Sequence, residues 1–334
     1  MENVDSQPND SKREERVSEK FIPVPLESLR LDTEVNFRIY VLAKKEEEPV
    51  LYRAENLKFT EEVRKRLQEN DVGHVYIDSS DRDEYWQYIE HNLDNILADN
   101  GIDSQKKAEI VYSSATQLIE HLFENPWMRE GIRRSEKLVE STAYFLLHDE
   151  TAFKHFLSVR SYDYYTYTHS VNVYVFSVAL AERVGISEMS DVVALGTGAL
   201  LHDVGMSLVD RRIVNKSGPL NAQELAAIKK HPSHGVRILR EAGGISEDCL
   251  AVVSQHHERC DGSGYPEGLR ADEIHPHGRV TAIADVFDAM TTKRVYKDAV
   301  GSFATLQTMK NEMREGLDQH MFREFIRLMG RQVE

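Results

Sequence analysis

The sequence HHERCDGSGYPEG, residues 256–268, decides how the C-terminal half of the chain folds. It opens with the adjacent histidines His256 and His257, and its second part holds three glycines and a proline, which do not fit a regular helix or strand. The apolar residues Leu250, Val252 and Val253 precede it and predict a buried helix that ends at the histidines. A helix end that presents paired imidazoles beside a glycine-bent loop is suited to a metal site with a lip for a substrate.

The overall composition limits the class of protein. The chain has 334 residues, which is enough for two domains with separate cores. It carries 41 Lys and Arg against 56 Asp and Glu, for a formal net charge of -15. Because phosphate binding requires clustered positive charge, this balance argues against a DNA, RNA or membrane partner. An anionic substrate must therefore be bound locally, by a metal or by a few placed basic residues.

The cysteines and the uncharged segments indicate a cytoplasmic protein. Cys249 and Cys260 are the only two cysteines, too few for a disulfide framework. The N-terminus is polar and contains no apolar signal core. The longest uncharged run, 164–181, contains Thr166, His169 and Asn172, so it predicts a buried helix and not a membrane span.

The N-terminal part is expected to form a small α+β module. Residues 1–20 are charged throughout and are predicted to be a disordered tail. Alternating apolar and polar residues predict strands in the module at 21–90, and an acidic first turn predicts a helix. These elements are strands at 35–43, 49–54 and 73–78, a charged hairpin turn at 44–48, an extended segment from Phe21, and a helix capped by Thr60 that ends at Glu69.

The rest of the chain is predicted to be helical. Residues 91–150 should form a helical linker or the helices of a homodimer, at 104–125 and 129–149. From 151 to 334 no alternating pattern occurs, so the fold class is mainly α, an all-α domain preceded by the small module. The helices expected in this domain are 165–184, 187–203, 221–242, 246–257, 278–293, 301–315 and 318–330.

Histidines and carboxylates on several of these helices form a candidate metal site. Asp203 and Asp285 stand among apolar residues, where an unpaired carboxylate is costly to bury. A lone His-Asp pair is better explained by a structural hydrogen bond, but imidazoles and carboxylates from several helices can converge on metal ions. Such mixed sets suit iron, manganese or zinc, and two ions that share a hydroxide suit phosphodiester hydrolysis. The candidates are His169, His202, Asp203, His231, His256, His257 and Asp285.

The remaining nine histidines are expected to play other roles. His234, His275 and His277 lie near the candidate set in the sequence, but we do not expect them to be ligands. The others stand in polar or helical surroundings and predict surface or capping roles; they are His74, His91, His121, His148, His155 and His320.

These residues resemble a known family. The order His169, His202-Asp203, Asp285 resembles the HD superfamily of metal-dependent phosphohydrolases. HHERCDGSGYP resembles the signature of the HD-GYP branch, which hydrolyses the bacterial messenger cyclic di-GMP, and the segments 231–239 and 279–297 match other blocks of that branch. The resemblance covers roughly residues 150–330, and residues 21–90 resemble a small module that precedes some HD-GYP domains.

The resemblance implies a role for each matching position. The seven candidates would bind two divalent ions, iron or manganese, with Asp203 bridging them. Arg294 and Lys297, as catalytic cations, and Asp288 would face the dinucleotide. Tyr265 and Pro266 would shape the lip of the site, and Arg259 is a further candidate for substrate contact. The alternatives are a solvated helix end for Arg294 and Lys297 and loop packing for Tyr265.

The sequence departs from the family pattern at three positions. Tyr165 stands where some members carry a glutamate that helps to hold a third metal, so we expect two. Met206 replaces the lysine of the usual HDxGK motif, so an ammonium near the substrate phosphate or the bridging water is missing. Val295 replaces the usual proline of an RPY motif.

The sequence therefore predicts a dinuclear-metal phosphodiesterase. A hydroxide shared by the two metals would open cyclic di-GMP to pGpG, with GMP as a further product left open. The loss of the lysine at Met206 predicts lower activity. It also favours the alternative, a weak or inactive cyclic di-GMP receptor that signals through protein partners. A phosphohydrolase for another cyclic dinucleotide or nucleotide is a third hypothesis.

Overall fold

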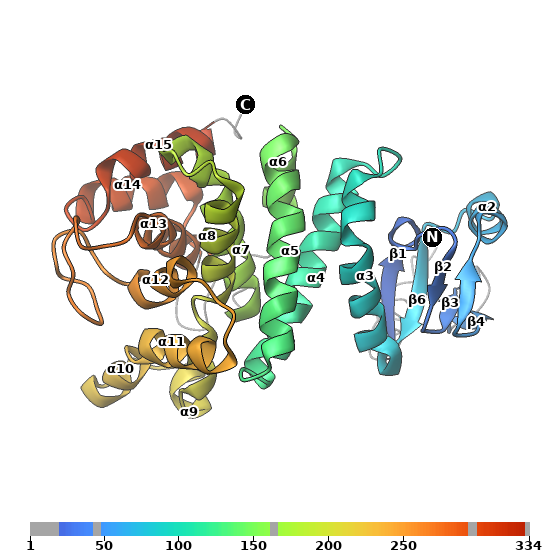
Figure 1. The fold of residues 1–334 in the computed structure, drawn as a ribbon, viewed down its shortest axis with the longest axis horizontal. Coiled ribbons are helices and arrows are strands. Elements are labelled where there is room, and N and C mark those ends of the chain that lie inside the picture. Colours follow the sequence, from blue (N-terminus) through green and yellow to red (C-terminus); the bar gives the residue numbers. More distant parts are fainter. Residues whose placement is uncertain (1–19, 43–47, 161–165, 293–298, 331–334) are drawn as a thin grey trace, which may run out of the picture. The chain divides into compact units, whose positions relative to one another are not determined.

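The computed structural model describes residues 20–42, 48–160, 166–292 and 299–330 (Figure 1). The chain divides into two compact units, Met1–Ile110 and Val111–Glu334. Helix α4 (Ser104–Glu124) begins in the first unit and ends in the second. The division into a tail, a module, a linker and a helical domain at the boundaries expected above stays a prediction.

The first unit contains two antiparallel sheets. The larger has the strand order β1-β6-β3-β4, and the smaller pairs β2 with β5. The predicted hairpin is present, because β3 pairs with β4. The single strand expected at 35–43 is wrong, since residues 36–38 lie between two separate strands. The strands are β1 (Phe21–Pro25), β2 (Thr33–Val35), β3 (Ile39–Val41), β4 (Val50–Arg53), β5 (Leu57–Phe59) and β6 (His74–Asp78).

Two helices complete the first unit. α3 (Arg82–Ala98) buries Tyr85, Ile89 and Ile96 in the same core as Phe37 and Val75 of the strand region. α2 (Glu61–Glu69) begins with two glutamates, which favour the positive end of the helix dipole. Thr60 stands at the N-cap of α2, but its side chain makes no capping hydrogen bond, so that prediction is wrong.

The second unit is helical, which confirms the predicted fold class. Among its described residues the only β-type pairing is an isolated bridge between Asp261 and Arg270. Besides the C-terminal part of α4 and short 3-10 turns, it contains α5 (Arg129–His148), α6 (Ala152–Val159), α7 (Thr166–Ala181), α8 (Met189–Leu201), α9 (Arg211–Val214), α10 (Ala222–Ile228), α11 (His231–Ala242), α12 (Glu247–Gln255), α13 (Pro276–Thr291), α14 (Ser302–Glu312) and α15 (Gln319–Gly330).

Helix α7 forms the centre of this unit and is buried on almost every side. It packs against α8 and α13, and α12 packs against both of those helices (Figure 1). α8 and α12 approach closely at Gly198, where a Cβ would lie 2.6 Å from Cβ of Val252. Within the described residues, no helix is long and apolar enough to cross a membrane.

The helix predicted at 221–242 is two helices in the structure. α10 starts with a capping box between Asn221 and Glu224. The helix ends before Lys229 and Lys230, which separate it from α11. Pro232 then stands in the first turn of α11, where its missing N–H group is no loss. This break places His231 at the first position of α11, where its side chain can point away from the helix.

Candidate metal centre

The fold brings all seven predicted ligands together. They come from the ends or inner faces of five helices that are separated in the sequence. All except His257 are at least nine-tenths buried. They are His169 in α7, His202 and Asp203 directly after α8, His231 at the start of α11, His256 and His257 directly after α12, and Asp285 in α13.

Two sets of ligand atoms lie side by side and share Asp203. One atom from each of Asp203, His231, His256 and His257 lies within 4.8 Å of the others, and the same holds for His169, His202 and Asp203. The carboxylate of Asp285 lies 3.2 Å from Nε2 of His169 and 3.5 Å from Nδ1 of His257. This arrangement offers two adjacent positions for metal ions, with carboxylates between them.

The helix ends fix which nitrogen of three histidines carries the proton. Nδ1 of His202, His231 and His256 lies at hydrogen-bond distance from a main-chain carbonyl three residues earlier, that of Ala199 (2.7 Å), Ile228 (2.8 Å) and Val253 (3.0 Å). A carbonyl only accepts, so Nδ1 donates and Nε2 keeps its lone pair. All three lone pairs are therefore available to a metal ion.

These lone pairs have no satisfactory protein partner. Nε2 of His202 is buried without a hydrogen bond. Nε2 of His231 and Nε2 of His256 face each other at 3.1 Å, although neither bears a proton to donate. A buried nitrogen lone pair without a hydrogen-bond donor lowers the free energy of unfolding, and a bound cation would supply the missing partner. The residues present therefore fit divalent metal ions, and the donor types suit iron, manganese or zinc.

The pKa values of His256, His257 and Asp285 favour the deprotonated forms that metal binding requires. Burial and neighbouring imidazoles hold the pKa of His256 well below its ordinary value, and burial lowers that of His257 to about 3. Burial opposes ionisation of Asp285, but the hydrogen bond from His169 holds its pKa well below the usual range. His169 differs: burial lowers its pKa, but hydrogen bonds to Asp285 and Asp288 outweigh this and raise it to about 10.

Asp288 is held by internal hydrogen bonds, and its predicted contact with the dinucleotide stays a prediction. Its side chain is fully buried and accepts hydrogen bonds from Nδ1 of His169 (2.8 Å) and the amide of Asn172 (2.9 Å). The guanidinium of Arg160 lies 3.8 Å away. These internal donors already satisfy the carboxylate, which instead orients the ring of His169 so that Nε2 points at the other ligands.

Glu258 organises the loop, a role that the sequence did not reveal. Its side chain is buried, and its carboxylate accepts hydrogen bonds from the main-chain N–H groups of Glu267 (2.7 Å), Gly268 (3.2 Å) and Leu269 (2.9 Å). The available signal was a carboxylate beside a glycine-rich loop, whose N–H groups need acceptors. The sequence does not show that this carboxylate turns inward.

The lip residues lie beside the ligands. The ring of Tyr265 stacks on His257 with centroids 4.6 Å apart, and the ammonium of Lys229 lies 4.9 Å from the centre of the same ring. The Tyr265-Pro266 peptide bond is cis. Arg259 donates from Nη1 to the carbonyls of His256 and Glu258 and so braces the loop, while its contact with a substrate stays a prediction.

Several predicted positions lie outside the described residues. They are the catalytic candidates Arg294 and Lys297, and the two departures Val295 and Tyr165. The third departure, Met206, is described: it lies partly buried in the 3-10 helix η4 (Val204–Leu208), and its amide donates to the carbonyl of Asp203 at 2.8 Å. The chain thus carries Met206 on the turn that follows the shared ligand.

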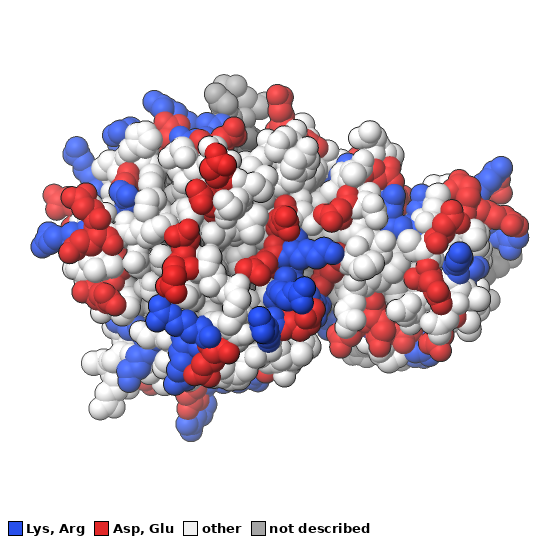
Figure 2. Space-filling model, in the orientation of Figure 1, with Lys and Arg blue, Asp and Glu red and all other residues white. Residues whose placement is uncertain are grey.

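One part of this acidic chain is rich in basic side chains. On the face shown in Figure 2, blue side chains gather over the part formed by α9 to α11, and further blue side chains lie elsewhere on the same face. The basic residues of this segment are Arg211, Arg212, Lys216, Lys229, Lys230, Arg237 and Arg240. Of these, Lys229 is the one placed against the lip, by its contact with Tyr265.

The part of the chain that carries this site matches a family model and is similar to known proteins. Residues 169–321 match the family model described as HD domain. A cyclic di-GMP phosphodiesterase of Pseudomonas aeruginosa is 31% identical over 67% of this chain and 54% of its own length. A 3'3'-cGAMP-specific phosphodiesterase of Vibrio cholerae is 30% identical over 70% of this chain and 51% of its own length. The chain therefore spans about half the length of these relatives.

A solved structure has the same fold over most of the chain. Bd1817, an HDG"Y"P protein from Bdellovibrio bacteriovorus, superposes with a TM-score of 0.64 over 93% of this chain and 99% of that protein. The two sequences are 22% identical, so the likeness shows the fold alone.

Proposed function

We propose that this chain, which belongs to the HD-GYP branch of the HD-domain superfamily, is a metal-dependent phosphodiesterase that opens cyclic di-GMP to pGpG. The observation that carries this proposal is the pair of candidate ligand sets that share Asp203, together with the Nδ1 hydrogen bonds that leave Nε2 of three imidazoles available to a metal ion. Further hydrolysis of pGpG to GMP at the same site belongs to the proposal.

The seven ligands would hold two divalent ions, iron or manganese. Bound there, the ions would supply an activated water and offset the charge that develops on the phosphate. The protein residues would position the substrate. Glu258 holds the loop in place, and Tyr265 would stack its ring on a base of the dinucleotide. Arg294 and Lys297, together with Lys229, are proposed as the cations that meet the phosphates.

Met206 should lower this activity without abolishing it. A thioether cannot carry positive charge or donate a proton, so one electrostatic contact with the substrate is missing. The loss of one such contact costs about 2 to 4 kcal/mol of transition-state stabilisation. Turnover slower than that of an enzyme with lysine at this position is the expected consequence.

Two other functions are supported by specific observations. The Vibrio cholerae relative is named as specific for 3'3'-cGAMP, so a mixed cyclic dinucleotide is a second candidate substrate. Met206 supports a receptor that binds cyclic di-GMP and signals through a protein partner. Both alternatives use the same candidate metal centre. The second substrate differs from the proposal in one base, and the receptor differs in lacking the chemical step.

A single set of assays separates the three functions. Purified protein loaded with Mn²⁺ or Fe²⁺ is incubated with cyclic di-GMP or 3'3'-cGAMP, and both the linear product and the bound ligand are measured. The proposal expects linear product from cyclic di-GMP and a higher rate in Met206→Lys. Preferred turnover of 3'3'-cGAMP would identify the second candidate. Tight binding without product, in both the wild type and Met206→Lys, would establish the receptor.

A further inference from the structure

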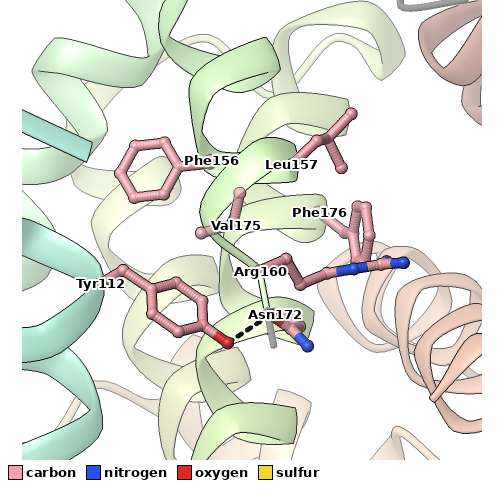
Figure 3. A pocket seen from close by; sticks show the side chains of 7 residues that line it. All are labelled: Tyr112, Phe156, Leu157, Arg160, Asn172, Val175 and Phe176. Atoms are coloured by element: carbon pink, nitrogen blue, oxygen red, sulfur yellow. Dashed lines mark hydrogen bonds between the residues drawn. The ribbon is translucent and has the colours of Figure 1, made fainter. Parts of the chain in front are cut away.

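A buried hydrogen-bonded chain leads from helix α4 to the candidate ligand His169. The hydroxyl of Tyr112 in α4 donates to Oδ1 of Asn172 at 3.0 Å (Figure 3). The amide of Asn172 in turn donates to Asp288 at 2.9 Å. The other oxygen of Asp288 lies 2.8 Å from Nδ1 of His169. All four side chains are at least nine-tenths buried, so water does not compete for these bonds.

The hydrogen bonds from Tyr112 through Asn172 can run in only one donor-to-acceptor direction, because they end on the carboxylate of Asp288. Asp288 can only accept hydrogen bonds, so the NH₂ group of Asn172 must point at it. The carbonyl oxygen of Asn172 then points the other way, where Tyr112 is its donor. Without that donor, the amide would keep a buried, unsatisfied oxygen or rotate and turn this oxygen toward the carboxylate. The hydroxyl of Tyr112 therefore stabilises the orientation of the amide.

Asp288 in turn determines how His169 can bind a metal. Its carboxylate accepts a hydrogen bond from Nδ1–H, which leaves Nε2 of His169 directed at Asp203 and Asp285. A carboxylate behind a ligating imidazole fixes its tautomer and orientation and raises its basicity. The guanidinium of Arg160 lies on the far side of Asp288, over the ring of Phe176.

We propose that Tyr112 is a positioning residue of the metal centre, acting through Asn172 and Asp288 on the ring of His169. Tyr112 lies outside the segment that matches the HD domain, 57 residues before its first matched residue, His169. It lies on α4, in the part of this helix that belongs to the second unit, so α4 has a physical connection to a candidate ligand of the site. The inference rests on the proposed metal-dependent function.

The test compares the metal affinity of matched variants. Metal-free protein is titrated with Mn²⁺, and the dissociation constant is measured by calorimetry for the wild type, Tyr112→Phe and Asp288→Asn. Loss of the partner of a ligating histidine weakens metal binding about 10- to 100-fold, and Tyr112, one link further away, should have a smaller effect of roughly 3- to 10-fold. Tyr174→Phe is the control, since Tyr174 lies on α7 and is fully buried but outside the hydrogen-bonded chain.

The double variant separates positioning from a general loss of stability. If Tyr112 acts through Asp288, Tyr112→Phe should have no further effect on Mn²⁺ affinity in the Asp288→Asn background. The inference is overturned if Tyr112→Phe and Tyr174→Phe bind Mn²⁺ equally well, or if the effect of Tyr112→Phe is undiminished in the double variant. A wild type that binds no divalent ion would contradict the proposed function itself, and this inference with it.

Discussion

Asp203 is the residue that joins the two halves of the candidate centre. One of its oxygens lies 3.2 Å from Nε2 of His231, and the other lies 3.6 Å from His202 and 4.0 Å from His169. Burial opposes its ionisation, but the three surrounding imidazoles hold its pKa below the ordinary value. The side chain therefore offers a carboxylate to both positions at neutral pH, as a bridging ligand must.

Glu258 is the residue whose loss should affect the loop without affecting the ligands. In Glu258→Gln, one carboxylate oxygen becomes an NH₂ group that faces main-chain N–H donors. Hydrogen bonds to charged groups are each worth about 1.5 to 3 kcal/mol, so the lip should loosen and KM for cyclic di-GMP should rise at least about tenfold. Metal content should stay at the wild-type level.

The matched control for Glu258 is Glu267→Gln in the same loop. Glu267 is exposed, and only its main-chain N–H group contacts Glu258. Steady-state kinetics of both variants, with metal content measured alongside, provide the comparison. Equal KM values for the two variants would show that the buried carboxylate does not organise the lip.

Among the elements, η4 and α11 meet with almost no space between their backbones. A Cβ at Gly205 would lie 2.0 Å from the carbonyl oxygen of His231 and 2.5 Å from the amide of Gly235. Gly205→Ala should therefore displace the start of α11, and overpacking of this kind costs about 1 to 3 kcal/mol of unfolding free energy. Because His231 stands at this helix start, Mn²⁺ affinity should fall too.

Gly218→Ala is the control for this element, because no atom lies within 4 Å of a Cβ added at Gly218. Urea unfolding and Mn²⁺ titration of both variants measure the two effects. Wild-type stability and affinity in Gly205→Ala would mean that η4 and α11 can separate at little cost.

In the first unit, Asp81 and Arg38 connect the 3-10 turn that follows β6 to the segment before β3. The carboxylate accepts from Nε (2.8 Å), Nη2 (2.9 Å) and the main-chain N–H (3.1 Å) of Arg38. These bonds, led by the side-chain hydrogen bond, lower the pKa of Asp81 from 3.8. A carboxyl with a depressed folded-state pKa adds stability above its unfolded pKa and loses it as the pH falls.

The stability difference between wild type and Asp81→Asn should therefore depend on pH. It should be fully present at pH 7 and shrink below about pH 4, when the carboxyl is protonated in both states. This difference in unfolding free energy is measured by urea unfolding at pH 7 and pH 3. The fluorescence of Trp86, in a Trp127→Phe background, reports on the first unit alone. A difference that is the same at pH 7 and pH 3 would argue against the ion pair as its source.

At the scale of the whole molecule, the centre depends on the complete helical unit. Its ligands are spread from His169 to Asp285, and no local segment holds more than two of them. They converge only when α7, α8, α11, α12 and α13 are packed together. Metal binding should therefore be coupled to the folding of this unit, since an ion that binds the folded state stabilises it.

The same separation explains what could be predicted from the sequence. The candidate ligands could be singled out because each has a distinctive residue type at a helix end or on an apolar face, and the signature at 256–268 adds their context. The role of Asp288 could not be predicted, because its donors come from distant segments: Asn172 is 116 residues from Asp288. The role of Glu258 could not be predicted either, because the sequence does not show that its carboxylate turns toward the N–H groups of its own loop. The break at Lys229 was hidden, because both flanking segments keep a helical pattern.

The most direct test of the central claim measures metal content and cyclic di-GMP turnover in the same samples of wild type and Asp203→Ala. The account predicts that the wild type holds about two divalent ions per chain and forms pGpG, with manganese or iron giving the activity. Asp203→Ala should lose metal and turnover together. A metal-free wild type, or an Asp203→Ala variant that retains both properties, would contradict it.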